Sequence, residues 1–198
     1  MTLAREDVHV DDAALDDASL IERSLTEPEV FADLFDRYAP LLHRYVTRRL
    51  GPAEAEDVVA DTFLAAFQRR GAYDRGRPDA RPWLYGIASN VIGKRRRTET
   101  SLYRAYLRTG VHPAQTANTQ VEDGVNTLAV NLPLARALLK LKQVDRDVLL
   151  LVAWAELSYQ EIADALAIPL GTVGSRLNRA RAQIRQALQP GQKAEQGE

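Results

Sequence analysis

Apolar residues recur at every third or fourth position along most of the chain, which is the spacing of one face of an α-helix. This pattern predicts a first long helix over residues 29–49. The Gly51-Pro52 pair ends that helix and starts a second one over residues 53–70, because proline fits a first helical turn. Residues 72–82, rich in Gly, Pro and charge, form a predicted loop before a third helix, for which Asp79 is the candidate N-cap. Alternation typical of strands is almost absent, so the sequence predicts an all-α fold.

A change in composition divides the chain into two small helical domains. The segment 99–131 is rich in Thr, Gln and Asn and poor in large apolar residues, so it buries too little surface to offset its ordering entropy. We interpret it as a flexible linker with room for a short helix around residues 102–108. Helical spacing returns at Leu134 and continues to Leu188. The predicted organisation is an acidic extension (1–16), an N-terminal domain (17–98), the linker (99–131), a C-terminal domain (132–189) and a disordered tail (190–198).

The C-terminal domain carries a helix-turn-helix pattern. Ser158 and Glu161 have the spacing of a capping box, and a tight connection over residues 167–171 leads to a second helix that begins near Thr172. At about 100° per residue, an apolar wedge of that helix faces inward and its polar residues lie opposite. Hydroxyls and guanidiniums suit base edges and phosphates, and the helix holds four Arg and no acid, which favours DNA over a merely solvated face. The inward set is Val173, Leu177, Ala180 and Ile184, and the outward set is Thr172, Ser175, Arg176 and Arg179.

The third helix of the N-terminal domain combines two glycines with a cationic end. Gly86, Asn90 and Gly93 share one strip, and each glycine costs about 1 kcal/mol relative to Ala in a helix. The strip is either a bare notch that a nucleobase enters, with the amide of Asn90 at its floor, or a surface for close helix packing. The helix continues into four consecutive cations, Lys94, Arg95, Arg96 and Arg97.

The loop before this helix adds an aromatic ring to further cations. Proteins bind single-stranded nucleic acid by stacking bases on aromatic rings and neutralising phosphates with cations. The loop offers both kinds of side chain, in Tyr73, Arg75, Arg77 and Arg81. Tyr73 is equally well explained as a lid over the core.

The charges are unevenly distributed, although the formal net charge is only −1. Residues 1–36 hold 11 carboxylates against two arginines, and the rest of the chain has a net charge of +8. Such an uneven distribution of charge is typical of proteins that bind a polyanion with their basic part. The second helix is locally acidic through Glu54, Glu56, Asp57 and Asp61, which indicates either a basic protein partner or a solvated face.

Composition excludes several classes of protein. The chain has no cysteine, and its three histidines (His9, His43 and His112) lack the spacing of metal ligands, so we expect no metal and no cofactor. The sequence contains neither a phosphate-binding loop nor a set of carboxylates and a base with catalytic spacing, so we do not expect an enzyme. No apolar run reaches the roughly 18 residues of a membrane helix, and the acidic start is unlike a signal peptide, so a cytoplasmic location is expected.

Together these motifs resemble a bacterial sigma factor of the extracytoplasmic-function (ECF) group of the sigma-70 family. The opening of the second conserved region resembles DASLIERSL followed by FADLFDRYAPLLHRYV. The helix that docks on the β′ clamp of RNA polymerase resembles AEDVVADTFLAAFQR, and the segment that reads the −10 element resembles RPWLYGIASNVIGKRRR. The helix-turn-helix that reads the −35 element resembles LSYQEIADALAIPLGTVGSRLNRARAQIR. The resemblance spans roughly residues 17–188, with the linker unmatched.

The resemblance implies a role for each matching residue and a set of partners. It implies core RNA polymerase (β′ clamp and β flap), promoter DNA and an anti-sigma factor as partners, with Asn90 holding a flipped-out base. Three positions depart from the family pattern, namely Ala60, Gly93 and Gly174. The implied −10 residues are Asn90, Lys94, Arg95, Arg96, Arg97, Tyr73, Arg77 and Arg81; the −35 residues are Thr172, Ser175, Arg176 and Arg179; the polymerase contacts are Glu56, Asp57, Asp61, Phe63 and Leu64.

The implied function is that of a specificity subunit that directs promoter recognition and local melting, with the two domains loosely tethered. We therefore expect the free protein to bind promoter duplex poorly and to gain specificity with the core enzyme. The alternative is a dimeric helix-turn-helix regulator that binds an operator without polymerase, which leaves the cationic run after Asn90 unexplained.

Overall fold

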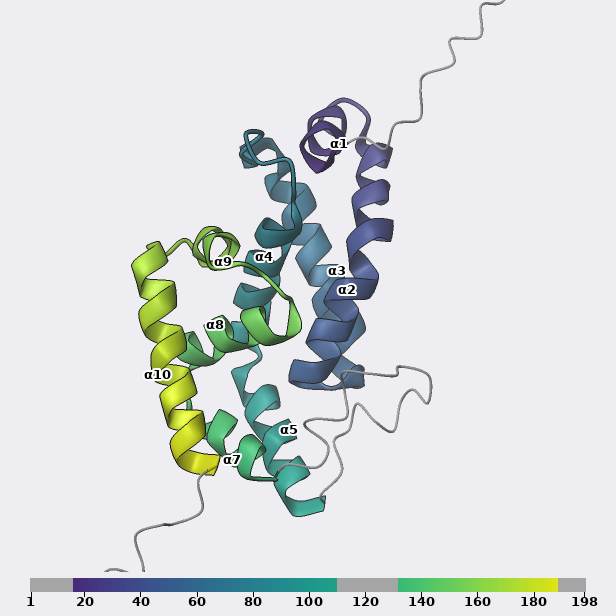
Figure 1. Cartoon of the computed structure of the whole chain (residues 1–198). Helices are drawn as coiled ribbons and strands as arrows, with labels where there is room; N and C mark the ends of the chain where they lie inside the picture. The colour runs from purple at the N-terminus through teal and green to yellow at the C-terminus, as the bar shows by residue number, and fades with distance from the viewer. Residues whose placement is uncertain (1–15, 110–131, 189–198) are drawn as a thin grey trace, which may run out of the picture.

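The computed structural model describes residues 16–109 and 132–188, and in these ranges all regular structure is helical, as expected (Figure 1). Two single-turn 3₁₀ helices, Pro28–Phe31 and Arg70–Ala72, supplement the α-helices. The α-helices are α1 (Asp17–Arg23), α2 (Ala32–Leu50), α3 (Pro52–Arg69), α4 (Arg81–Lys94), α5 (Arg96–Thr109), α7 (Leu132–Lys140), α8 (Gln143–Trp154), α9 (Tyr159–Leu166) and α10 (Leu170–Leu188).

The N-terminal unit is built on α2, α3 and α4. Gly51 joins the first two helices with a φ of 91°, a conformation that glycine adopts without strain, and Pro52 begins α3 as predicted. Helix α4 packs against both α2 and α3. The buried side chains of this core include Leu34, Leu42, Val46, Val58, Ala66, Leu84 and Ile92.

The loop before α4 is held by the buried carboxylate of Asp17. Its Oδ2 accepts hydrogen bonds from the backbone N–H of Ala80 (2.7 Å) and from the hydroxyl of Tyr38 (2.5 Å). Burial, followed by these acidic neighbours, raises the pKa of Tyr38, so the hydroxyl remains a donor. Asp79 Oδ1 accepts from the N–H of Arg81 (2.8 Å), so Asp79 serves the first turn although Ala80 occupies the N-cap position. The entry into α4 is therefore fixed by two carboxylates.

Helix α5 corrects the predicted boundary of the linker. Residues 96–109 are helical, whereas the sequence analysis places a flexible linker from residue 99 onward with room only for a short helix around residues 102–108. The reason is long-range: Glu99 and Tyr103 are buried, and Glu99 Oε1 accepts from Nε of Arg49 on α2 (2.9 Å). The segment is therefore ordered by contacts with a residue 50 positions away, which its local composition does not reveal. The rest of the predicted linker, the predicted N-terminal extension up to residue 15 and the predicted tail lie outside the described residues.

The C-terminal unit contains the predicted helix-turn-helix, formed by α9 and α10. The capping box is present: the N–H of Glu161 donates to Ser158 Oγ, and the N–H of Ser158 donates to Glu161 Oε2. Ala167 ends α9 in the left-handed conformation (φ 50°). Of the predicted inward wedge of α10, Val173, Leu177 and Ala180 are fully buried, and Ile184 is partly buried against the same core.

The two units pack directly against each other, which the expectation of loosely tethered domains did not include. Helix α9 lies beside α4, and α7 lies beside α5 (Figure 1). A Cβ atom on Gly86 would lie 2.2 Å from the carbonyl oxygen of Ala165, and one on Gly93 would lie 2.9 Å from Nε2 of Gln143. The glycines of α4 therefore allow close helix packing, which is one of the two alternatives that the sequence left open.

Candidate functional site

Asn90 is exposed on α4 beside a hollow of about 320 Å³. One wall comes from the loop before α4 and from Trp83, and the other comes from Asp164 and Ala165 of α9. Asn90, the residue predicted to read a base, thus lies on the surface of the N-terminal unit. Helix α9 of the C-terminal unit partly covers the space beside it.

Tyr73 lines the same hollow but is a core residue, with 7 % of its surface exposed. Its hydroxyl donates to the carbonyl oxygen of Arg77 (2.7 Å), and its ring centroid lies 5.0 Å from that of Trp83. Burial, with Asp17 and Asp79 nearby, raises the pKa of Tyr73. Of the two roles that the sequence left open for Tyr73, this geometry matches the lid over the core.

The predicted DNA-contacting arginines of the loop are engaged by the C-terminal unit. Arg81 Nη2 donates to the carbonyl oxygens of Ala155 (2.8 Å) and Glu156 (3.2 Å), which connect α8 to α9. Arg77 Nη1 forms an ion pair with Asp164 Oδ2 at 2.9 Å. These two arginines hold α9 against α4 in the present arrangement.

The cationic run at the end of α4 contains one arginine paired with acids of α3 and two exposed cations. Arg95 Nη1 donates to Glu54 Oε2 (2.5 Å) and its Nη2 donates to Asp61 Oδ2 (3.0 Å). These hydrogen bonds, led by that of Glu54, raise the pKa of Arg95. Lys94 and Arg97 are exposed, whereas the side chain of Arg96 lies outside the described part. Arg95 thus joins α4 to the acidic helix α3 and neutralises part of its charge.

The predicted polymerase-binding face lies on α3. Glu56, Asp57 and Leu64 are exposed, and Leu64 has 56 % of its surface accessible. Phe63, also predicted at or near this face, is only 6 % exposed, and its ring centroid lies 4.8 Å from that of Phe35. Its apolar side chain faces the core, so it supports this surface from beneath.

The outward face of α10 is less cationic than its own sequence indicates. Thr172 and Arg176 are half-buried, and Ser175 and Arg179 are exposed. The guanidinium of Arg179 forms two hydrogen bonds of 2.9 Å with the buried carboxylate of Asp145 on α8. The charge of Arg179 is therefore opposed by an acid 34 residues away, which a helical wheel of α10 does not include.

A buried ion cluster between the units was missed from the sequence. Arg49 is fully buried, and its Nη2 lies 2.8 Å from Glu99 Oε1 and 2.7 Å from Asp147 Oδ1 on α8. Arg146 is also buried, with Nη1 3.8 Å from Glu99 Oε2, and its Nε and Nη1 atoms have no hydrogen-bond partner. The only signal in the sequence is that Arg49 continues the apolar i, i+3, i+4, i+7 pattern begun by Leu42.

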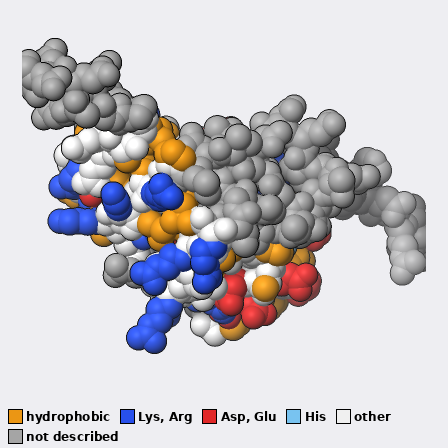
Figure 2. All heavy atoms as spheres, turned by 90° about the horizontal axis from the view of Figure 1, so that it is seen from below, with side chains coloured by type: hydrophobic (Ala, Val, Ile, Leu, Met, Phe, Trp, Pro, Cys, Tyr) orange, Lys and Arg blue, Asp and Glu red, His pale blue; other side chains and the backbone are white. Residues whose placement is uncertain are grey.

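On one face of the molecule, cationic and acidic side chains gather in separate areas (Figure 2). Seen from below, Lys and Arg side chains gather toward the side of α10, and Asp and Glu side chains gather on the opposite side (Figure 2). In the described ranges no group of three His, Asp or Glu side chains could hold a metal ion. None of the helices found in those ranges is long and apolar enough to cross a membrane.

Comparison with known proteins decides the family. Residues 34–101 match the family model "Sigma-70 region 2", and residues 131–184 match "Sigma-70, region 4". The chain is 36% identical over 168 residues to the ECF RNA polymerase sigma factor SigL of Mycobacterium tuberculosis, covering 82% of this chain and 91% of that protein. It is also 31% identical over 170 residues to SigW of Bacillus subtilis, with 82% and 90% covered. The chain belongs to the ECF sigma factors.

Solved structures agree with this assignment. CnrH, determined in complex with the cytosolic domain of CnrY, matches 87% of this sigma factor and 96% of its own chain, with a TM-score of 0.59 and 25% identity. RpoE of Bartonella quintana, determined with the anti-sigma factor NepR, shares the fold with a TM-score of 0.56. The resemblance stated from the sequence is thereby confirmed at the level of family and fold.

Proposed function

We propose that this sigma factor binds core RNA polymerase and directs it to promoters, reading the −10 element with α4 and the −35 element with α10. The observation that carries the proposal is that Asn90 and the outward face of α10 stand on separate helical units of one chain, in the order typical of the family. Glu56, Asp57 and Leu64 on α3 provide the exposed acidic and apolar surface for the β′ clamp, and the C-terminal unit contacts the β flap. The chain acts as a non-enzymatic, cytoplasmic regulator of initiation.

The packing of α9 on α4 makes this a closed form of the protein. Arg81 donates hydrogen bonds to the α8–α9 connection, and Arg77 forms an ion pair with Asp164. The missing side chain of Gly86 allows the backbone of Ala165 to approach closely. A promoter strand that enters beside Asn90 has to displace α9, and core polymerase separates the units as it binds each of them. The expectation that the free chain binds promoter DNA poorly follows from this geometry.

An anti-sigma factor is the partner that keeps such a form inactive. The solved relatives CnrH and RpoE are each bound to another protein, CnrY and the anti-sigma factor NepR respectively. A regulator of that class is expected to bind this chain across both units, in competition with core polymerase.

Run-off transcription with purified core enzyme and a promoter library tests the function directly. The wild-type chain should generate new start points, and Asn90→Ala should lose selectivity at one position of the −10 element because the amide no longer reads that base. Gln183→Ala removes an exposed amide near the end of α10 and serves as the matched control. Specific binding to a palindromic site without polymerase, with no transcription, would favour the dimeric regulator instead.

The separation of the two units can be followed with spin labels. Because the chain has no cysteine, two introduced cysteines are the only sites that take the labels. Spin labels at Ala32→Cys on α2 and Ala182→Cys on α10, both exposed positions, report the separation of the units. The distance distribution should be short and narrow for the free chain and longer with core enzyme. An unchanged distribution in an active complex would contradict the proposed closure.

A further inference from the structure

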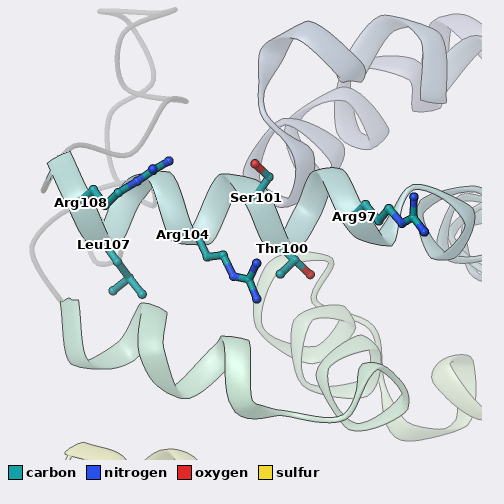
Figure 3. A pocket seen from close by; sticks show the side chains of 6 residues that line it. All are labelled: Arg97, Thr100, Ser101, Arg104, Leu107 and Arg108. Carbon is teal, nitrogen blue, oxygen red and sulfur yellow. The ribbon is translucent and has the colours of Figure 1, made fainter.

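Helix α5 presents one cationic strip, of which the sequence analysis singled out only Arg97. Arg97, Ser101, Arg104 and Arg108 follow one another at spacings of four, three and four residues, so they fall within about 60° around the helix axis. All four side chains are exposed. Figure 3 shows them along α5 beside a hollow of about 830 Å³, with Thr100 and Leu107 at its edge.

The opposite face of α5 fixes the direction of this strip. Glu99 and Tyr103 point into the protein, where Glu99 pairs with the buried Arg49 of α2. An amphipathic helix anchored by a buried ion pair has little freedom to rotate, so its cations are held toward one side. The strip is thus positioned by the core of the N-terminal unit.

The arginines of the strip form no ion pair with the carboxylates of the described residues. Arg97, Arg104 and Arg108 form none of the ion pairs found there, whereas Arg77, Arg95 and other surface arginines do. An exposed arginine that forms no ion pair with the described residues can bind a polyanion at little desolvation cost. Among the side chains of α5 that the structure describes, none is a large exposed apolar group of the kind that the centre of a protein-binding surface normally supplies.

We propose that this strip of α5 binds the phosphate backbone of promoter duplex that flanks the −10 element. The inference rests on the proposed function, because α5 (from Arg96) follows α4 (to Lys94) almost without interruption and continues the cationic run after Asn90. From Arg97 to Arg108 the helix rises about 16 Å, a length that spans roughly five phosphates of one strand. Ser101 adds a hydroxyl donor of the kind that commonly contacts phosphate oxygens. The contact carries no sequence information and orients the duplex for reading by α4.

The salt dependence of promoter binding by the complete holoenzyme tests the proposal. Each lost phosphate contact lowers the magnitude of the slope of log K against log[salt] by about 0.9. Arg104→Gln should therefore reduce the slope by about 1, and Arg104→Gln with Arg108→Gln by about 2, equally for promoters of different sequence. Arg44→Gln is the matched control, since Arg44 is exposed on α2 and forms no described ion pair.

Neutral methylphosphonate linkages, placed in blocks of five along the flanking duplex, identify the contact. One block should abolish the difference in salt slope between the wild type and the double variant. The phosphate charges that the arginines neutralise are missing from that block. Equal slopes for the wild type and the double variant, or a defect that no block removes, would overturn the proposal. A defect only in binding core enzyme would assign the strip to a protein partner and overturn it as well. If the wild-type holoenzyme made no transcript, the proposed function itself would fail, which is a distinct result.

Discussion

Gly86 on α4 and Ala165 on α9 touch backbone to backbone: a Cβ on Gly86 would lie 2.2 Å from the carbonyl oxygen of Ala165. No real side chain tolerates that separation, and the obstacle is backbone rather than a flexible side chain. The cost of a glycine inside α4 is thus offset by close approach of the two helices. The same contact places α9 beside the exposed amide of Asn90.

The substitution Gly86→Ala should open the closed form. Because α4 cannot move away from its own core, α9 has to shift, and the contacts of Arg77 and Arg81 with the C-terminal unit weaken with it. We expect a larger radius of gyration by small-angle scattering and faster amide exchange in α9. Binding to single-stranded −10 DNA without polymerase should rise.

Gly174→Ala is the control for this substitution. A Cβ on Gly174 would meet nothing within 4 Å, so the same chemical change in α10 causes no clash. Alanine is favoured over glycine in a helix by about 1 kcal/mol, and this variant should be slightly more stable and keep the wild-type radius. An unchanged radius for both variants would show that Gly86 does not control closure.

Local pattern was enough to predict the elements themselves. The capping box at Ser158, the inward wedge with Val173 and Leu177, and the proline start of α3 all depend on residues within one or two turns. Local rules determine such features because the interacting groups are close in sequence.

The long-range pairs could not be predicted in this way. Arg49 meets Asp147 across 98 positions, and Arg179 meets Asp145 on a different helix. Periodicity marks which face of a helix is buried and does not identify the helix that covers it. For the same reason α5 was assigned to a linker, since the partner of Glu99 lies on α2.

The cluster around Asp147 gives closure a defined dependence on pH. Burial raises the pKa of Asp147 above its ordinary value of 3.8, and Arg49 opposes this rise in part. Glu99 from α5 also raises it, while Arg146 on α8 lowers it. The closed, folded chain therefore binds this proton more tightly than a chain in which Asp147 is solvated. The resulting stabilisation is fully present below pH 3.8 and is lost as the pH rises through the raised pKa.

Urea unfolding at a series of pH values tests the sign. The wild type should lose stability relative to Asp147→Asn as the pH rises from about 4 toward neutrality, because the asparagine carries no proton to lose. Asp33→Asn, which changes an exposed carboxylate on α2, should track the wild type. If the wild type instead gained stability relative to Asp147→Asn as the pH rises, the ion pair with Arg49 would lower the pKa of Asp147 by more than burial raises it.

The capping box should contribute measurably to the stability of the C-terminal unit. Ser158→Ala removes the acceptor for the N–H of Glu161 and should cost about 1 kcal/mol. Ser158→Asp keeps an acceptor at the N-cap and should retain most of that stability. Fluorescence of Trp154 on α8, in a Trp83→Phe background, follows the unfolding of this unit. Equal midpoints for the Ala and Asp variants would contradict a role for the cap.

Asp145 should restrain DNA binding by α10. Its carboxylate accepts both hydrogen bonds of Arg179 and cancels one positive charge on the predicted −35 face. Asp145→Asn preserves the shape of the buried side chain and leaves the guanidinium of Arg179 uncompensated. Non-specific binding of the holoenzyme to duplex DNA should therefore tighten, and its salt slope should steepen by about 0.9 if the freed cation reaches one phosphate. The double variant Asp145→Asn, Arg179→Gln should return the slope to the wild-type value, because the added positive charge is removed again. A steeper slope that persists in the double variant would show that Arg179 is not the group that Asp145 holds back.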